Sequence, residues 1–291
     1  MQRETRNRWL FTFLETNTEI IAAYLDQDTD MRLRDITGAL EAFAPLSLQD
    51  GFDNAGLQIG LTEDVDTTGV LLCLDVTEDV VDEAIRKGCN VVVSHHPLLF
   101  HPCKSITGAD YIQRTIMKAI RGGVAIYSAH TNLDNANGGV NNKMAEKLEL
   151  ANYSVLQPKA GDAETGAGLI GTLPSPIDKE DFIRQVKATF HVDCLRCNRW
   201  TGQRVSRVAL CGGAGAFLIP DAIKAGADVF ITGEIGYHRF FGYENDIMLM
   251  EIGHYESEQY TREITRQILS AQFPQLLIID TETDTNPICY Y

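Results

Sequence analysis

Residues 70–96, VLLCLDVTEDVVDEAIRKGCNVVVSHH, decide the fold, because two apolar runs enclose a helix-forming stretch. Residues 70–75 predict a buried strand, and Thr77 and Gly88 are suitable as the N-cap and the stop of the following helix. Residues 91–94 predict a second buried strand. Two apolar strands joined by a helix indicate a parallel pair in a sheet that is covered on both faces.

The same pattern recurs 138 positions later, at residues 208–234, VALCGGAGAFLIPDAIKAGADVFITGE. The two stretches share 7 identical residues in 27 ungapped pairs. Shared strand–helix–strand patterning alone would give some of these matches, but an internal duplication is the better interpretation. It places residues 95–96 and 233–234 at equivalent strand ends, so Glu234 is a predicted neighbour of His96.

The rest of the chain continues this alternation of helix and strand. Further helices are predicted at residues 32–44, 112–120, 142–150, 178–190, 219–224 and 256–269, and further strands at 57–60, 124–129, 169–173, 205–211, 229–232, 247–252 and 275–280. The fold class is therefore α/β, with parallel or mixed sheets.

A short Gly-rich stretch at residues 161–168, GDAETGAG, is the predicted boundary between two units. We expect a first unit made of residues 31–160 plus 240–291, and a second, related unit at 161–239. Residues 1–30 precede the pattern and are interpreted as an N-terminal extension, which need not be ordered, or as an over-long translation start.

Composition limits the classes of function. The 291 residues are 44% hydrophobic and 22% charged, as in ordinary soluble globular proteins. A formal net charge of −15 repels phosphate backbones and argues against non-specific nucleic-acid binding. No apolar run approaches the ~20 residues of a membrane span, and no cleavage site follows the apolar patch at residues 9–14, so we expect a cytoplasmic protein.

Four of the seven histidines stand at or just after predicted strand ends, the edge at which open α/β sheets bind ligands. His95 and His96 follow the strand at residues 91–94. In a turn, which Pro97 helps to fix, each could serve a different ion of a close pair. The alternative is a buried histidine pair with backbone partners.

Two more segments offer metal ligands. His254 and Glu258 share a face at the start of a predicted helix, although an acidic helix end would look the same. Asp134 follows the strand that leads to His130, and its oxygens could bridge two cations or merely cap a turn. Together the three segments supply three imidazoles and two carboxylates, which suit Zn, Fe, Mn or Co. The sequence therefore predicts a site for two divalent metal ions.

Other polar features have plainer interpretations. His101, His191 and His238 are expected to be structural or exposed, and Asp53 either supports the site or forms a turn. Residues 212–215, GGAG, fit neither GxGxxG nor a Walker motif, so a tight strand-to-helix turn is expected. The seven cysteines are scattered, which predicts reduced thiols, and the CxxC at residues 194–197 has no second pair at zinc-site spacing.

Several blocks now point to a known family. They are GFDNAGL at 51–57, SHHPLLF at 94–100, HTNLD at 130–134, GGVN at 138–141, TGE at 232–234 with His238, and GHYESE at 253–258. From residue 31 to its end the chain resembles the YbgI-like family, whose members are called GTP cyclohydrolase type-2 homologues or NGG-interacting-factor-like proteins. Phe52 stands where many members have a tryptophan.

The resemblance implies a dinuclear metal centre whose ligands are His95, His96, Asp134, His254 and Glu258. It also implies two interlocked, duplicated α/β units with mixed sheets and a toroidal homohexamer. Some members carry an inserted domain, which we do not expect here.

The family name suggests a metal-dependent hydrolase that opens the imidazole ring of GTP, or acts on another nucleotide, and releases formate. In that scheme His130 or Glu234 could transfer protons. One alternative is a non-enzymatic scaffold that stores or delivers metal or binds a protein partner, which the acidic surface suits better than DNA. A second alternative is a dinuclear phosphoesterase.

Overall fold

The segment at residues 70–96 forms the centre of a five-stranded mixed sheet in this computed structural model, which describes residues 31–60 and 64–291. The strand order is β1 (Gly56–Ile59), β4 (Ala125–Ser128), β3 (Val91–Ser94), β2 (Val70–Cys73) and β11 (Ile278–Asp280). β1 is antiparallel to β4, and the other neighbours are parallel. The predicted extension at residues 1–30 lies outside the described residues.

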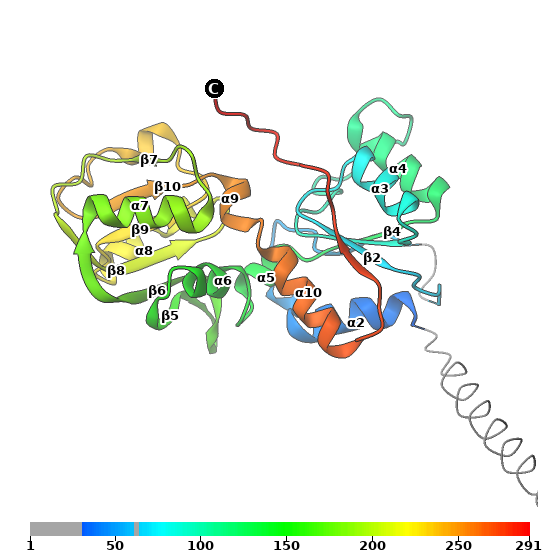
Figure 1. Cartoon of the computed structure of the whole chain (residues 1–291), viewed down its shortest axis with the longest axis horizontal. Coiled ribbons are helices and arrows are strands. Elements are labelled where there is room, and N and C mark those ends of the chain that lie inside the picture. The colour runs from blue at the N-terminus through cyan, green and yellow to red at the C-terminus, as the bar shows by residue number, and fades with distance from the viewer. Residues whose placement is uncertain (1–30, 61–63) are drawn as a thin grey trace, which may run out of the picture.

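Helices cover both faces of this sheet (Figure 1). They are α2 (Leu33–Phe43) and α10 (Thr261–Gln272) on one face, and α3 (Glu78–Arg86) and α4 (Tyr111–Gly122) on the other. Leu72 and Val93 pack toward α2 and α10, whereas Leu71 and Val92 pack toward α3 and α4. Burial on both faces explains why these strands are continuously apolar. Thr77 caps α3 as predicted, accepting a hydrogen bond from the Val80 N–H at 3.3 Å.

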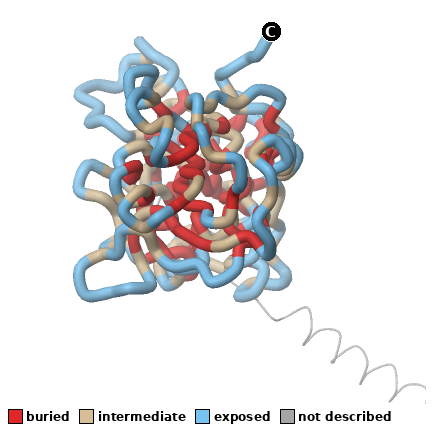
Figure 2. The backbone as a smooth tube through the Cα atoms, turned by 90° about the vertical axis from the view of Figure 1, so that its left-hand side faces the viewer, coloured by how far each residue is buried: buried red, intermediate tan, exposed pale blue. Residues whose placement is uncertain are grey.

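A second, six-stranded mixed sheet forms the other lobe. Its order is β5 (Ala151–Lys159), β6 (Asp162–Asp178), β8 (Arg204–Cys211), β9 (Val229–Thr232), β10 (Met248–Glu251) and β7 (Arg196–Cys197). Its helices are α6 (Val140–Lys147) and α7 (Lys179–Phe190) on one face and α8 (Ile219–Lys224) on the other. Figure 2 looks onto this lobe and shows the buried residues inside a shell of exposed loops. The predicted α/β class with two mixed sheets is confirmed.

The two sheets repeat one arrangement. Val70 lies opposite Val91 in the first sheet, and Val208 lies opposite Val229 in the second, which is the same pairing moved by 138 positions. The third strands also correspond, since Val91 pairs with Ala125 and Val229 with Met248. A five-residue helix follows each third strand, α5 (Thr131–Asn135) after β4 and α9 (His254–Glu258) after β10. The correspondence therefore extends beyond the segment found in the sequence.

The lobes exchange chain segments at their junction, where α5, α6, α9 and α10 lie (Figure 1). α6 crosses to the second sheet and packs on β6 and β8, while α10 returns to pack on α2 and β2. The C-terminal strand β11 then joins the first sheet. Beyond it, the Thr281 and Thr283 hydroxyls donate to the buried carboxylate of Glu83 on α3.

The division of the strands between the two sheets differs from the predicted boundaries between the units. β5 and β10 belong to the second sheet, although residues 31–160 and 240–291 were assigned to the first unit. The Gly-rich stretch is the tip of the β5–β6 hairpin, where Lys159 pairs with Asp162 and Gly161 adopts a φ of 84°. A turn that needs a positive φ looks like a linker in sequence because both use glycine.

Two helices stand where a single one was predicted at residues 256–269. α9 ends at Glu258, and α10 begins at Thr261 after a short turn. Short 3-10 helices, labelled η, lie between the other elements: η1 (Leu46–Leu48), η2 (Gly215–Leu218) and η3 (Tyr237–Phe240). Within residues 31–60 and 64–291, no helix has the length and apolar character to span a membrane.

Candidate metal centre

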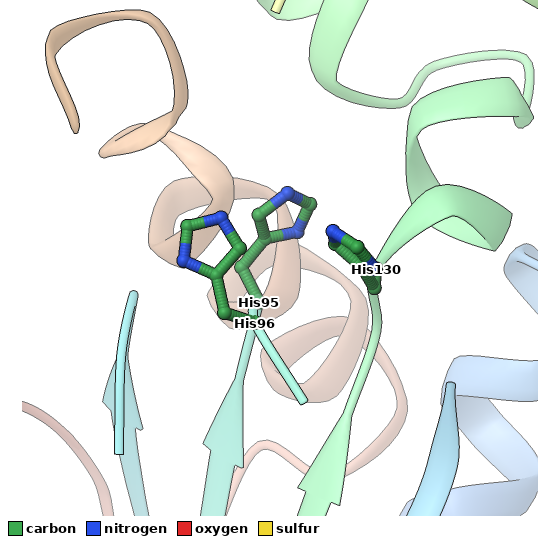
Figure 3. A group of neighbouring side chains, drawn as sticks. All are labelled: His95, His96 and His130. Carbon is green, nitrogen blue, oxygen red and sulfur yellow. The ribbon is translucent and has the colours of Figure 1, made fainter. Parts of the chain in front are cut away.

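His95 and His96 leave the end of β3 in different directions (Figure 3). Their backbone N–H groups both donate to the Leu74 carbonyl, at 3.2 and 3.0 Å, so the chain turns at this point. The ring centroids lie 5.0 Å apart, with 49° between the planes. His95 Nδ1 donates to the Ala129 carbonyl at 2.7 Å, and His96 Nδ1 donates to Asp75 Oδ1 at 2.7 Å.

Two further residues follow β4: His130 stands just before α5, and Asp134 lies within α5. His130 Nδ1 lies 2.6 Å from Asp53 Oδ1, and the Thr131 N–H donates to Asp53 Oδ2 at 3.0 Å. The His130 ring is 5.2 Å from the His95 ring (Figure 3). Asp53, for which the sequence left two roles open, therefore orients His130.

The second lobe supplies His254 and Glu258 from α9. Nδ1 of His254 lies 2.8 Å from Oε1 of Glu234, which follows β9. The structure thus brings Glu234 to the edge of the cluster, where its hydrogen-bond partner is His254 rather than His96, the neighbour that the repeat predicted. Its carboxylate is 60% exposed and lies on the outer side of His254, opposite Nε2.

All four histidines share one arrangement. An acceptor holds each Nδ1, and each Nε2 is left for the shared interior. Metal-binding histidines in proteins are held in this way by carboxylates and carbonyls. Asp75, one of these acceptors, escaped the sequence analysis. It comes two residues after β2, so the strand-end rule that selected the histidines would have found it.

One group of three side chains has the spacing of ligands to a single ion. His96 Nε2 lies 2.9 Å from Glu258 Oε2, His254 Nε2 lies 3.0 Å from the same oxygen, and the two nitrogens are 3.2 Å apart. Ligands of one tetrahedral ion lie ~3.3 Å apart when each is about 2.0–2.1 Å from it. These residues therefore fit a divalent cation.

A second group shares Glu258 with the first. His95 Nε2 lies 3.6 Å from Glu258 Oε1 and 3.6 Å from Asp134 Oδ1. His95 Nε2 and Asp134 Oδ1 are buried and have no hydrogen-bond partner in the described part of the chain. Buried polar atoms normally have a partner, so these two atoms also fit a cation. His130 joins a further potential group with His95 and His96.

The ionisable groups of the cluster shift one another's pKa values. Burial alone disfavours the charged forms of His96 and His254, but hydrogen bonds to carboxylates outweigh it and raise their pKa values to about 10 and about 9. Burial raises the pKa of Asp134 well above its usual range. The pKa of Glu258 lies well below its usual range, because the surrounding imidazoles outweigh its burial. The cluster therefore attracts positive charge, and a metal ion would displace protons from it.

Gly212 and Gly213 form the wall behind Glu258. A Cβ atom on Gly213 would lie 2.2 Å from Glu258 Oε1 and 3.4 Å from His254 Nε2. Gly213 also has a φ of 59°, which favours glycine. The loop at residues 212–215 is thus the strand-to-helix turn that was expected, and it gives the two ligands room.

The cluster opens into a pocket of about 410 Å³ between the two lobes. Its lining includes the polar residues His96, His130, Asp134, His254 and Glu258 and the apolar residues Phe52, Phe100 and Phe217. The volume is within the range of sites for small organic ligands. The sequence singled out Phe100 only as the last residue of the family block at 94–100, and it did not point to Phe217, because an isolated aromatic residue carries no motif.

The remaining candidates lie elsewhere. Within the described residues, no cysteine belongs to a group of side chains that could hold a metal ion, and Cys194 is exposed. His101 lies in a neighbouring pocket, and His191 ends α7 with a φ of 57°. His238 packs beside Tyr237 on η3.

Comparison with known proteins places the chain in a family. Residues 31–287 match the model of the family described as Duf34/NIF3 (NGG1p interacting factor 3). The chain belongs to the DUF34/NIF3 family. A Clostridium perfringens member, named GTP cyclohydrolase 1 type 2 homolog, is 35% identical over 78% of this chain and 87% of its own length. A Lactococcus lactis member of the same name is 32% identical over 88% of this chain and 98% of its own length.

Solved structures of the DUF34/NIF3 fold are also similar. A Bacillus cereus protein related to NIF3 has a TM-score of 0.82 and 25% identity, over 91% of this chain and all (100%) of that chain. A Staphylococcus aureus protein has a TM-score of 0.82 and 27% identity, over 90% of this chain and 100% of that chain. The resemblance inferred from the sequence blocks is confirmed.

Proposed function

We propose that this protein is a hydrolase that uses two divalent metal ions. The observation that carries the proposal is the position of Glu258, whose two oxygens face two different groups of ligands. His95 and Asp134 complete one group, and His96 and His254 complete the other. We assign Zn, Fe, Mn or Co to both, because imidazole and carboxylate ligands without thiolate suit these metals.

Two close divalent cations would supply a water nucleophile at neutral pH and stabilise the charge that develops on the substrate. The chain's own contribution is to position groups around them. His130 lines the pocket and is held by Asp53, whose low pKa of about 2 keeps it ionised. We therefore assign proton transfer to His130 rather than to Glu234, whose contact with His254 Nδ1 favours a positioning role.

We propose opening of a purine imidazole ring, as in GTP, as the reaction. Water adds to the ring carbon between the two nitrogens, one C–N bond breaks, and a formamide remains. A second water molecule hydrolyses the formamide to an amine and formate. The name shared by the clostridial and lactococcal relatives supports GTP, and the pocket supports a ligand of small organic size.

Formate release from GTP by purified, metal-loaded protein tests the proposal. Release that disappears in His95→Ala is the expected result, and a Tyr111→Ala variant, altered at an exposed residue outside the pocket, should retain it. No turnover across a panel of nucleotides and phosphoesters at full metal content would overturn it and favour a non-enzymatic metal scaffold. Turnover of phosphoesters alone would favour a phosphoesterase.

The toroidal homohexamer remains a prediction from family resemblance. Sedimentation velocity on the full chain would test it, and a monomer at micromolar concentration would contradict it.

A further inference from the structure

Three partly exposed phenylalanines line the pocket next to the proposed metal centre. Phe52 and Phe100 come from the first lobe, and Phe217 comes from η2 in the second lobe. They are 67%, 39% and 50% exposed. Large apolar side chains gathered around a polar site are a common mark of ligand binding, because a ligand would remove their surfaces from water.

These rings lead from the solvent to the metal centre. Phe52 meets Phe100 edge to face, with centroids 6.3 Å apart, and Phe100 meets His130 edge to face at 6.0 Å. Aromatic side chains at such separations form a continuous apolar surface. A flat ring that follows this surface would arrive with its edge beside His130.

The pocket offers little to hold a phosphate chain, because no lysine or arginine is among the described residues that line it. The described charged side chains that line it, apart from the histidines, are the carboxylates Asp50, Asp134 and Glu258. Lys159 reaches Asp50 at 3.2 Å but does not line the pocket. Carboxylates repel phosphate oxygens, and two divalent cations (+4) would exceed the charge of the three carboxylates (−3) by only one unit, which is a weak attraction for a triphosphate.

The side-chain amide nitrogens that line the pocket donate hydrogen bonds within the fold. Asn141 Nδ2 donates to the Asp134 carbonyl at 3.0 Å, and Asn141 Oδ1 accepts from the Gly212 N–H at 3.1 Å. Asn135 Nδ2 donates to the Leu48 carbonyl at 3.0 Å. Recognition is therefore left mainly to the aromatic surfaces and the metal centre.

We propose that the pocket binds a flat, uncharged nitrogen heterocycle, such as a purine base, and leaves any phosphate groups outside. The ring stacks on Phe52 and Phe217, and its edge faces His130 and the metal centre. The inference rests on the proposed function only for the choice of a purine, since the attacked carbon lies in the ring. It adds that the base, rather than the triphosphate, determines binding.

Calorimetric titration of zinc-loaded, desalted protein tests this inference. The probes are guanosine, GTP and ribose 5-phosphate, which carries phosphate but no base. Guanosine and GTP should bind with Kd values within about threefold of each other, and ribose 5-phosphate at least tenfold more weakly. Because stacking of one base contributes about 1–3 kcal/mol, Phe52→Ala and Phe217→Ala should each weaken guanosine binding by about 5-fold or more. Tyr111→Ala, at an aromatic residue that is 55% exposed and outside the pocket, should not.

GTP binding more than tenfold tighter than guanosine would overturn the inference, as would guanosine binding that is unchanged in both phenylalanine variants. The measurement needs no turnover. Guanosine binding that depends on the phenylalanines, together with no formate release, would leave this inference standing and remove only the proposed reaction.

Discussion

Gly213 and Glu258 are in such close contact that a Cβ on the glycine would lie 2.2 Å from Oε1 of the carboxylate. The contact joins the turn after β8 to α9, so the backbone of this turn limits where the Glu258 carboxylate, which we propose as the shared metal ligand, can lie.

A methyl group at this position should therefore damage the metal centre. We expect Gly213→Ala to weaken zinc affinity about tenfold or more, because Glu258 must move and alanine is strained at a φ of 59°. Competition with a chromophoric chelator would measure the affinity. Gly236→Ala is the matched control, since a Cβ there meets nothing within 4 Å. Equal affinities in the two variants would contradict the assignment of Glu258.

Glu258 and Asp134 should differ in the number of ions they control. Glu258 faces both ligand groups, whereas Asp134 belongs to one. We expect Glu258→Gln to lose both ions and Asp134→Asn to keep about one per chain. Elemental analysis of desalted protein gives the stoichiometry, and circular dichroism verifies the fold. The same metal content in both variants would be incompatible with a bridging Glu258.

Asp53 should support turnover without holding metal. It contacts Nδ1 of His130 and the Thr131 N–H, and it is not part of either group that shares Glu258. We expect Asp53→Asn to keep its metal and to lower kcat for formate release about 10–100-fold, because His130 loses its orienting partner. Loss of metal, or an unchanged kcat, would remove His130 from the proposed role.

Glu83 should make stability depend on pH. Burial opposes its ionisation, but hydrogen bonds from the Glu282 N–H, Thr281 and Lys87 lower its pKa from 4.5 to about 2. A lowered folded-state pKa adds stability above pH 4.5, and this stability is lost as the pH falls toward 2. The difference corresponds to ~3 kcal/mol at neutral pH.

Urea unfolding of Glu83→Gln should show this directly. The free energy of unfolding is expected to be lower than in the unchanged protein by about 2–3 kcal/mol at pH 7, and the gap should close as the pH falls below 4.5. A gap that does not change with pH would mean that Glu83 acts through packing alone.

Much of the fold could be predicted because the central strands are apolar on both faces and because α3 has a recognisable Thr77 cap and is followed by Gly88. The elements that escaped prediction depend on tertiary context. β5 is largely exposed, and β7 has two residues that are ordered by pairing with β10. The break between α9 and α10 has no proline or glycine to announce it.

The part of the site that could be predicted consists of residues that directly follow predicted strands. His95, His96, His130 and His254 were found by that rule, and Glu234 by the repeat. The division of the ligands into two groups could not be predicted, because it depends on which side chains the folded lobes bring together. The sequence left open whether Asp134 bridges two cations or caps a turn, and it did not indicate that Glu258 is the carboxylate that faces both groups.

The repeated strand–helix–strand unit has a consequence for how the molecule holds together. One group of potential ligands takes His96 from the first copy of the repeat and His254 and Glu258 from the second. An ion bound there would link the two copies. An ion that binds only when the two copies are in place would increase the free energy needed to separate them. The concentration of free metal would then affect the stability of the folded protein as well as its activity.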